Sequence, residues 1–224
     1  MAYRSFDNAG FDKSGRPFAK EIMNFQQQVL RTDISGMPLE WVGYQEAVKL
    51  ITLDQVSYSL GKTLYEVHGG INAISGLQSV VSVNAIIATQ GQHPHKHLFA
   101  SSYVPPLSNQ SLFRRDQNLC LYCGLQFPNS MLSRDHVHPL SQGGQDLWVN
   151  VVTACKRCNN HKADRTPEEA GMQLIAIPFC PTHAEYVYLQ GRQILNDQMD
   201  FLLAHFPRNS VLRQRVEQGE PLLV

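Results

Sequence analysis

The stretch CLYCGLQFPNSMLSRDHVHPLSQGGQDLWVNVVTACKRCNNHKADR, residues 120–165, decides the fold of the central part of this chain. It holds two Cys-x-x-Cys pairs, which are separated by residues 124–154. One such pair is weak evidence, but two pairs at this separation are typical of a tetrahedral zinc site with four cysteine ligands. Gly124, directly after the first pair, is expected to adopt a left-handed conformation that closes the turn. The predicted ligands of a structural Zn²⁺ are Cys120, Cys123, Cys155 and Cys158.

Between and after the two pairs, the pattern predicts a hairpin followed by a helix. Residues 131–137 are expected to form a strand that Pro139 ends, and residues 148–153 a return strand. Residues 141–144 then form the turn of the hairpin. A short helix over residues 155–164 follows, and it places the second cysteine pair on one face.

Four polar residues in this stretch are not needed to hold zinc. Asp135 and His136 close the first strand, and Asn150 lies next to the second. On the expected helix Asn159 lies about 100° beyond Cys158, so it can face the strand end that carries Asp135 and His136. The stretch therefore predicts one site for a hard metal ion between an Asp carboxylate and an Asn amide.

The order of these motifs resembles the HNH, or ββα-metal, nuclease family in its four-cysteine form. More loosely, residues 38–42, 113–116 and 165–171 resemble the corresponding segments of stand-alone bacterial HNH endonucleases. The shared motifs are Cys-x-x-Cys, Asp135-His136, Pro139, Gly143-Gly144, Asn150 and the Cys-x-x-Cys-Asn-x-x-Lys run that ends at Lys162.

This resemblance implies a metal-dependent endonuclease that acts on DNA by a one-metal mechanism. It implies that Asp135 and Asn159 hold Mg²⁺ or Mn²⁺, that His136 is the general base and that Asn150 braces the loop. The last letter of the motif is Asn159 here rather than His, a variant that occurs in the family. An amide oxygen suits Mg²⁺ better than an imidazole does.

Further residues are candidates for supporting roles. Arg134, Arg157 and Lys162 are basic and close to the expected site, so they are candidate phosphate contacts. His138 shares a side of the expected strand with His136, which makes it a candidate supporting residue.

Charge alone does not indicate a nucleic-acid partner. The chain has 19 Lys and Arg against 19 Asp and Glu, so it lacks a global basic footprint. We therefore expect non-specific affinity for DNA to be modest and salt-sensitive. Singly, each motif also fits an inactive zinc-stabilised nucleic-acid-binding module, which stays an alternative, as does a structured-RNA nuclease.

The chain as a whole is expected to be an α+β protein with the nuclease core in its centre. The N-terminal domain is predicted to contain a helix over residues 44–52 and strands over 55–60, 63–68 and 79–88. Residues 38–42 lead into that helix, and a short helix over 18–29 is a further expectation. The expected parts are an N-terminal arm (1–27), a small α/β domain (28–92), a linker (93–112), the nuclease core (113–170) and a helical C-terminal extension (171–224).

Two capped helices are expected after the second cysteine pair. Thr166 with Glu169 and Thr182 with Glu185 have the spacing of a capping box, and the second box precedes a helix over residues 183–206. An apolar stripe on that helix is expected to dock on the body, with a homodimer as the alternative; it comprises Leu195, Met199, Leu202 and Phe206. Arg213 and Arg215 are interpreted as solvated charge rather than as DNA contacts.

Two smaller features have bland interpretations. Alternate histidines at positions 93, 95 and 97 suggest a second metal site, but a solvated loop is the favoured interpretation. Cys180 is expected to be a buried structural thiol.

The composition of the chain indicates the cellular compartment in which we expect it. With 43% hydrophobic residues in 224, the chain can bury a sizeable core, yet it has no apolar run of the ~20 residues that a membrane helix needs. Its start has no apolar segment of the kind found in secretory signals. Paired cysteines at metal-ligand spacing favour a reducing compartment, so we expect the cytoplasm.

Overall fold

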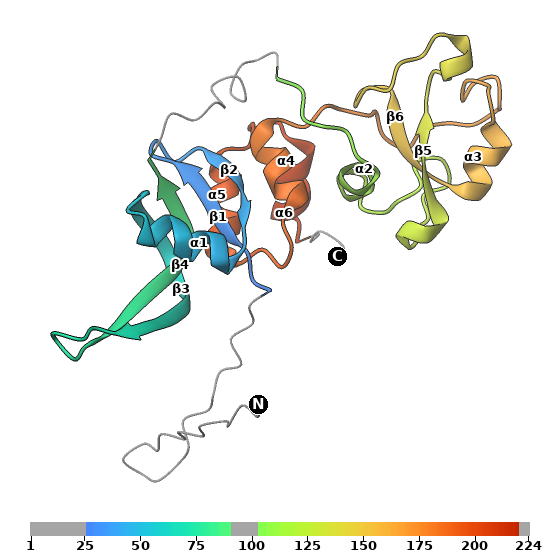
Figure 1. The fold of residues 1–224 in the computed structure, drawn as a ribbon. Coiled ribbons are helices and arrows are strands. Elements are labelled where there is room, and N and C mark those ends of the chain that lie inside the picture. The colour runs from blue at the N-terminus through green and yellow to red at the C-terminus, as the bar shows by residue number, and fades with distance from the viewer. Residues whose placement is uncertain (1–25, 91–102, 220–224) are drawn as a thin grey trace, which may run out of the picture.

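The computed structural model describes residues 26–90 and 103–219, and it has the predicted mixed α+β class. Figure 1 shows two units, one built on the larger sheet and one built on the hairpin of β5 and β6. The histidines at positions 93, 95 and 97 and most of the expected helix over 18–29 lie outside the described residues. In the part of the chain that the structure describes, no helix is both long and apolar enough to span a bilayer.

The larger sheet has four strands in the order β2-β1-β4-β3. Strands β1 and β4 run parallel, and the other two neighbouring pairs are antiparallel. Adjacent residues of β1 point to opposite faces, because Val29 packs with the cluster under α1 and Leu30 with the cluster under α4. The elements of this part are β1 (Val29–Asp33), β2 (Pro38–Val42), α1 (Tyr44–Thr52), β3 (Val56–Ile71) and β4 (Gln78–Thr89).

The predicted helix α1 is confirmed in its bounds, and β4 extends the predicted strand by one residue at each end. Three expectations for this region were wrong. Residues 38–42 form an edge strand rather than a lead-in, and the chain is already extended at Val29. The two runs over 55–60 and 63–68 form one strand with register shifts, since Gly61 lets the chain bend without ending it.

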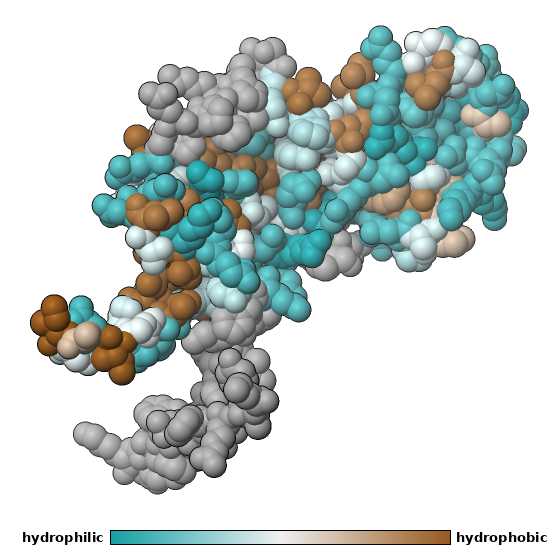
Figure 2. All heavy atoms as spheres, viewed as in Figure 1, coloured by the Kyte–Doolittle hydropathy of each residue, from teal (hydrophilic) through white to brown (hydrophobic). Residues whose placement is uncertain are grey.

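Hairpin β3–β4 extends beyond the rest of the sheet (Figure 1). Near the sheet, Tyr65 and Val83 are buried under α1. At the tip Ile71, Ile74 and Leu77 are exposed, and Figure 2 shows this tip as a brown, apolar end. The distal part of the hairpin therefore projects as a two-stranded ribbon with apolar side chains.

The C-terminal part forms three helices that pack on the larger sheet: α4 (His183–Gln190), α5 (Asn196–Ala204) and α6 (Val211–Glu217). The expectation of one helix over 183–206 was wrong, because α4 ends at Gly191 and Gln193 has a positive φ of 49°. A Cβ at Gly191 would collide with Ile194 and Trp41, so the chain passes close to β2 here. The predicted apolar stripe lies in the core shared with β1 and β4, so a homodimer would need other residues.

Only one of the two predicted capping boxes starts a helix. Thr182 and Glu185 cap α4 with both reciprocal bonds. Thr166 and Glu169 also bond reciprocally, at 2.8 and 3.3 Å. Residues 167–171 nevertheless form only a turn, which Gly171 leaves with a φ of +65°.

The central unit contains the predicted hairpin and helix. Its antiparallel strands pair Leu132 with Cys155 and His136 with Val151. Strand β6 begins later than the predicted 148–153, because Trp148 turns into the core and donates to the Pro105 carbonyl at 2.8 Å. The elements are α2 (Asn109–Arg115), η2 (Asn129–Met131), β5 (Leu132–His136), η3 (Leu140–Gln142), β6 (Val151–Cys155) and α3 (Lys156–Lys162).

Helix α2 begins in the expected linker and ends in the expected nuclease core, and it joins the two units. The buried Arg114 donates to the carbonyls of Leu189 and Gly191 at 2.9 Å, which ties α2 to the end of α4. From α6, Arg215 donates to the Arg115 carbonyl at 2.6 Å, so it is not the solvated charge that the sequence suggested.

Arg115 anchors the central unit from inside. Its side chain is fully buried and pairs with Asp116 at 2.8 Å. It also donates to backbone carbonyls of Trp148 and Val151, and the Asp116 carboxylate accepts from the Thr153 N–H at 2.8 Å. Because the guanidinium and the carboxylate are paired with each other, both can be buried. Their hydrogen bonds to the backbone link α2 to β6.

Candidate active site

The four predicted zinc ligands come together at one end of the central unit. Their sulfur atoms all lie within 4.8 Å of one another. Gly124 has the predicted positive φ of +73°, and its N–H donates to the Cys120 carbonyl at 2.9 Å, which closes the first turn. The second pair bridges the end of β6 and the first turns of α3, where the Cys158 N–H points at the Cys155 sulfur. Four thiolate donors in this arrangement fit Zn²⁺ with no open position.

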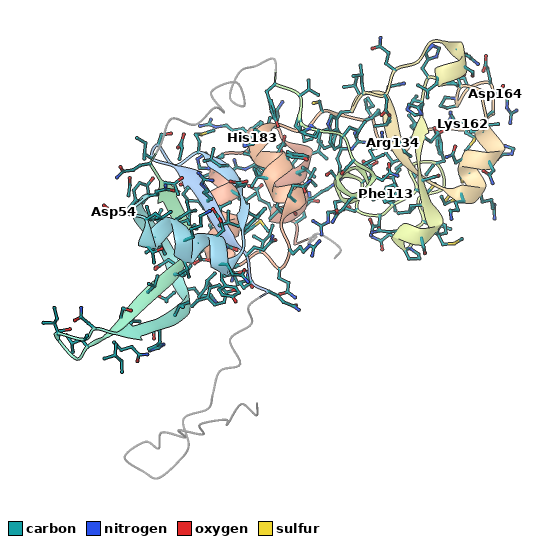
Figure 3. All side chains as sticks on the ribbon, viewed as in Figure 1. Asp54, Phe113, Arg134, Lys162, Asp164 and His183 are labelled. Carbon is teal, nitrogen blue, oxygen red and sulfur yellow. The ribbon has the colours of Figure 1, made fainter. Side chains whose placement is uncertain are left out.

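A separate pocket of about 300 Å³ lies where the end of β5 meets α3. It brings together three of the predicted site residues, Asp135, His136 and Asn159. In Figure 3 the labelled side chains of Arg134, Lys162 and Asp164 lie in this part of the central unit. The remaining lining residues are Pro139, Leu140, Ser141 and Ala163.

Asp135 is held on both of its carboxylate oxygens. The Tyr122 hydroxyl donates to Oδ2, and the Lys162 ammonium lies 3.1 Å from Oδ1. Burial and the bond to Asp135 raise the pKa of Tyr122, so its hydroxyl stays a donor. Because each carboxylate oxygen has a second acceptor position, the group can still bind an ion in the pocket.

Lys162 lies on the predicted side of α3, but its side chain is buried rather than exposed. Its side chain is 1% exposed, and Nζ also donates to the His136 carbonyl at 2.7 Å. As placed, it is a buried partner of Asp135 and not a surface contact for phosphate. The helical spacing predicted the correct face of α3 for Lys162, but it could not show that the ammonium bonds to residues of β5.

Asn159 faces the strand end, as the helical geometry predicts. Its Nδ2 donates to Ser133 Oγ at 2.8 Å and to the Arg134 carbonyl at 3.3 Å. Because the nitrogen is hydrogen-bonded to β5, the amide oxygen of Asn159 is the atom available as a ligand for an ion. The carboxylate of Asp135 and this amide oxygen form an oxygen donor set that fits Mg²⁺ or Mn²⁺.

His136 ends β5 at the mouth of the pocket. Its Nε2 lies 2.8 Å from Oδ1 of Asp146, and Oδ2 of Asp146 lies 2.6 Å from Nη1 of Arg134. Burial tends to raise the pKa of Asp146, but hydrogen bonds from Arg134 and His136 outweigh it and lower that pKa. Sequence reasoning missed Asp146; its only signal was a carboxylate two residues after Gly144.

Asn150 braces the loop between β5 and β6. Its side chain accepts from the His138 N–H and donates to the His138 carbonyl, at 2.9 and 3.0 Å. It also donates to the Gln145 carbonyl at 2.8 Å. At Gly144 a Cβ would collide with the carbonyl oxygens of His138 and Pro139, so only glycine fits there.

The other candidates divide by exposure. Arg157 is exposed on α3, whereas Arg134 is held by Asp146 and by Asn109, whose Oδ1 lies 3.0 Å from Nε. The structure does not bring His138 to the pocket, because β5 ends at His136 and His138 is exposed beyond it. Cys180 is half-buried rather than fully buried, and burial raises the pKa of its thiol.

Comparison with known families agrees with this geometry. Residues 120–175, which contain both cysteine pairs and the pocket residues, match the family model described as HNH endonuclease. The chain carries an HNH endonuclease domain. This domain spans the hairpin, α3 and the four-cysteine site, and membership of its family supports nuclease activity.

Among solved structures, this chain is similar to the type II-C Cas9 enzyme from Actinomyces naeslundii. The identity is 18% and the TM-score is 0.23, over 56% of this chain and 18% of that enzyme. This chain thus spans less than a fifth of that enzyme's length. Comparison with curated proteins found no match.

Proposed function

We propose that this chain is a metal-dependent endonuclease that hydrolyses phosphodiester bonds of DNA, with His136 as the general base. The observation that carries the proposal is the pocket shared by Asp135, His136 and Asn159, within the residues that match the HNH endonuclease model. An oxygen donor pair beside an imidazole is the donor set that metal-assisted hydrolysis of a phosphodiester needs.

Asp135 and Asn159 would hold Mg²⁺ or Mn²⁺ in the pocket. When bound, the ion supplies Lewis-acid polarisation of the phosphate and stabilisation of the leaving oxygen. The four cysteines fill the coordination of Zn²⁺, so we assign zinc to folding and not to the reaction.

The residues of this chain divide the remaining work. The imidazole of His136 takes a proton from the attacking water, the role that histidine fills most often in general acid–base catalysis. Tyr122 and Lys162 fix the carboxylate of Asp135, and Asn150 fixes the loop that follows His136. Arg157 is exposed on α3 and is the proposed contact for a neighbouring phosphate.

The test uses supercoiled plasmid incubated with the full chain in Mg²⁺, in Mn²⁺ and in EDTA. We expect cleavage with either ion and none in EDTA. His136→Ala should reduce the rate by roughly 100- to 10,000-fold, the usual cost of losing a general base. The matched controls are His161→Ala and His138→Ala, which remove exposed imidazoles outside the pocket and should cleave like the wild type.

Two outcomes would replace the proposal. Plasmid that stays intact in every condition while DNA binding persists would indicate an inactive binding module. Cleavage of a folded RNA, but not of plasmid, would indicate an RNA nuclease.

A further inference from the structure

Asp146 links two basic side chains of β5, Arg134 and His136. One of its oxygens lies 2.8 Å from His136 Nε2 and the other 2.6 Å from Arg134 Nη1. Arg134 is in turn bound to Asn109 of α2, whose Oδ1 lies 3.0 Å from Nε. Four side chains therefore form one hydrogen-bonded series that runs from α2 to the imidazole at the pocket.

We propose that Asp146 is the positioning residue of His136: its carboxylate holds the ring at Nε2 and thereby leaves Nδ1 as the nitrogen that takes the proton. This inference rests on the proposed function for its catalytic consequence. Its structural content, a fixed ring in one tautomer, does not depend on that function.

The tautomer follows from the chemistry of the partner. An ionised carboxylate only accepts hydrogen bonds, so the nitrogen that faces Asp146 must carry the hydrogen. In the neutral ring the other nitrogen then keeps its lone pair. Hydrogen bonds from Arg134 and His136 lower the pKa of Asp146, which keeps the carboxylate ionised at neutral pH.

The carboxylate is itself held in place, as a positioning residue must be. Arg134 binds Oδ2 of Asp146, and Asn150 binds the carbonyl of the preceding residue, Gln145, at 2.8 Å. Asp146 does not line the pocket, so it acts on the reaction through His136 and not by contact with substrate or ion.

An exposed ion pair without function is the competing interpretation. Arg213 and Glu217 on α6 provide the comparison, because they lie 2.8 Å apart against 2.6 Å for Arg134 and Asp146, and Glu217 is 55% exposed against 49% for Asp146. Among the described residues, Glu217 pairs with an arginine alone, whereas Asp146 also binds an imidazole that lines a pocket. Glu217→Ala is therefore a control for the loss of an exposed, arginine-bound carboxylate.

The first measurement is kinetic and uses the zinc-loaded full chain. For Asp146→Ala we expect kcat for DNA cleavage to fall about 10- to 100-fold, the usual cost of removing the partner that orients a functional histidine. KM and binding to DNA in EDTA should stay unchanged, as should the zinc content. Asp146→Asn should recover most of the rate, because an amide oxygen can still accept from Nε2. Glu217→Ala should match the wild type.

The second measurement records the ring nitrogens of His136 by ¹H–¹⁵N NMR at alkaline pH, where the two tautomers are distinguished by which nitrogen carries the hydrogen. The His136 signals are assigned by their loss in His136→Gln. We expect the Nε2–H form in the wild type and a mixture of tautomers in Asp146→Ala. An Nδ1–H form in the wild type, an unchanged kcat in Asp146→Ala or an effect on KM alone would overturn the proposal. A wild type that cleaves nothing would refute the proposed function, while the tautomer would still decide the role of Asp146.

Discussion

The side chain of Asn150 binds both backbone polar groups of His138: its oxygen accepts the N–H at 2.9 Å and its nitrogen donates to the carbonyl at 3.0 Å. The backbone of Asn150 also accepts from the Val137 N–H at 2.8 Å. One residue beside β6 thus fixes the chain directly after His136. The position of the proposed base therefore depends on a residue that does not line the pocket.

Replacement of Asn150 by Ala should loosen this loop. The backbone groups of His138 lose their partners, which typically costs about 1–3 kcal/mol in unfolding free energy where water cannot replace them. Since these groups are partly solvated, we expect the lower end of this range, with a clear loss of cleavage. Thermal unfolding and plasmid cleavage measure the two effects. Asn160→Ala, which removes an exposed amide from α3, is the control.

Gly144 should not tolerate even the smallest side chain. A Cβ there would collide with backbone oxygens of His138 and Pro139, which cannot move as a flexible side chain could. We expect Gly144→Ala to lower the melting temperature and to abolish cleavage. Gly70→Ala is the matched control, because nothing lies within 4 Å of its added Cβ. Equal behaviour of the two variants would contradict this account of the loop.

Much of the central unit could be predicted because its signals are local. Two cysteine pairs specify a zinc site through ligand chemistry, and helical geometry alone turns Asn159 toward β5. Asp146 could not be placed in this way. Its contact with His136 spans a loop whose path is set by Asn150 and by the absence of a Cβ at Gly144.

Two of the wrong predictions have a common cause, which is packing between distant segments. Trp148 fits a strand by propensity, but its ring is drawn into the core by the Pro105 carbonyl, and β6 starts three residues later. The sequence predicts one continuous helix over residues 183–206, yet that helix is interrupted where Gly191 approaches Trp41 closely. Such contacts leave no periodic signal in the sequence.

Cysteine substitutions should separate the zinc ligands from the remaining thiol. Cys158→Ser removes one of four thiolates, and we expect loss of zinc and unfolding of the central unit, since metal binding and folding are coupled in such sites. Cys180→Ser should keep both zinc and structure, because Cys180 lies outside the cluster. Zinc content by mass spectrometry and circular dichroism measure the outcome. A folded, fully active Cys158→Ser chain would refute the structural role of zinc.

Lys162 provides a test of the charge in the pocket. Its ammonium is the buried partner of Asp135. In Lys162→Met the carboxylate of Asp135 should therefore keep, among the described residues, only the hydrogen bond from the Tyr122 hydroxyl. Removing one member of a buried ion pair typically costs about 3–5 kcal/mol, and we expect a value near the lower limit because the site borders a pocket.

Added Mg²⁺ should restore part of the stability of Lys162→Met, because an ion that binds only the folded chain shifts the unfolding equilibrium. The measurement is chemical unfolding with and without Mg²⁺, compared with Lys156→Met, which removes an exposed lysine from the same helix. We expect Mg²⁺ to stabilise Lys162→Met by more than it stabilises Lys156→Met. If Mg²⁺ shifted both variants equally, Asp135 would not be a ligand of the ion, and the donor set proposed for the pocket would have to be revised.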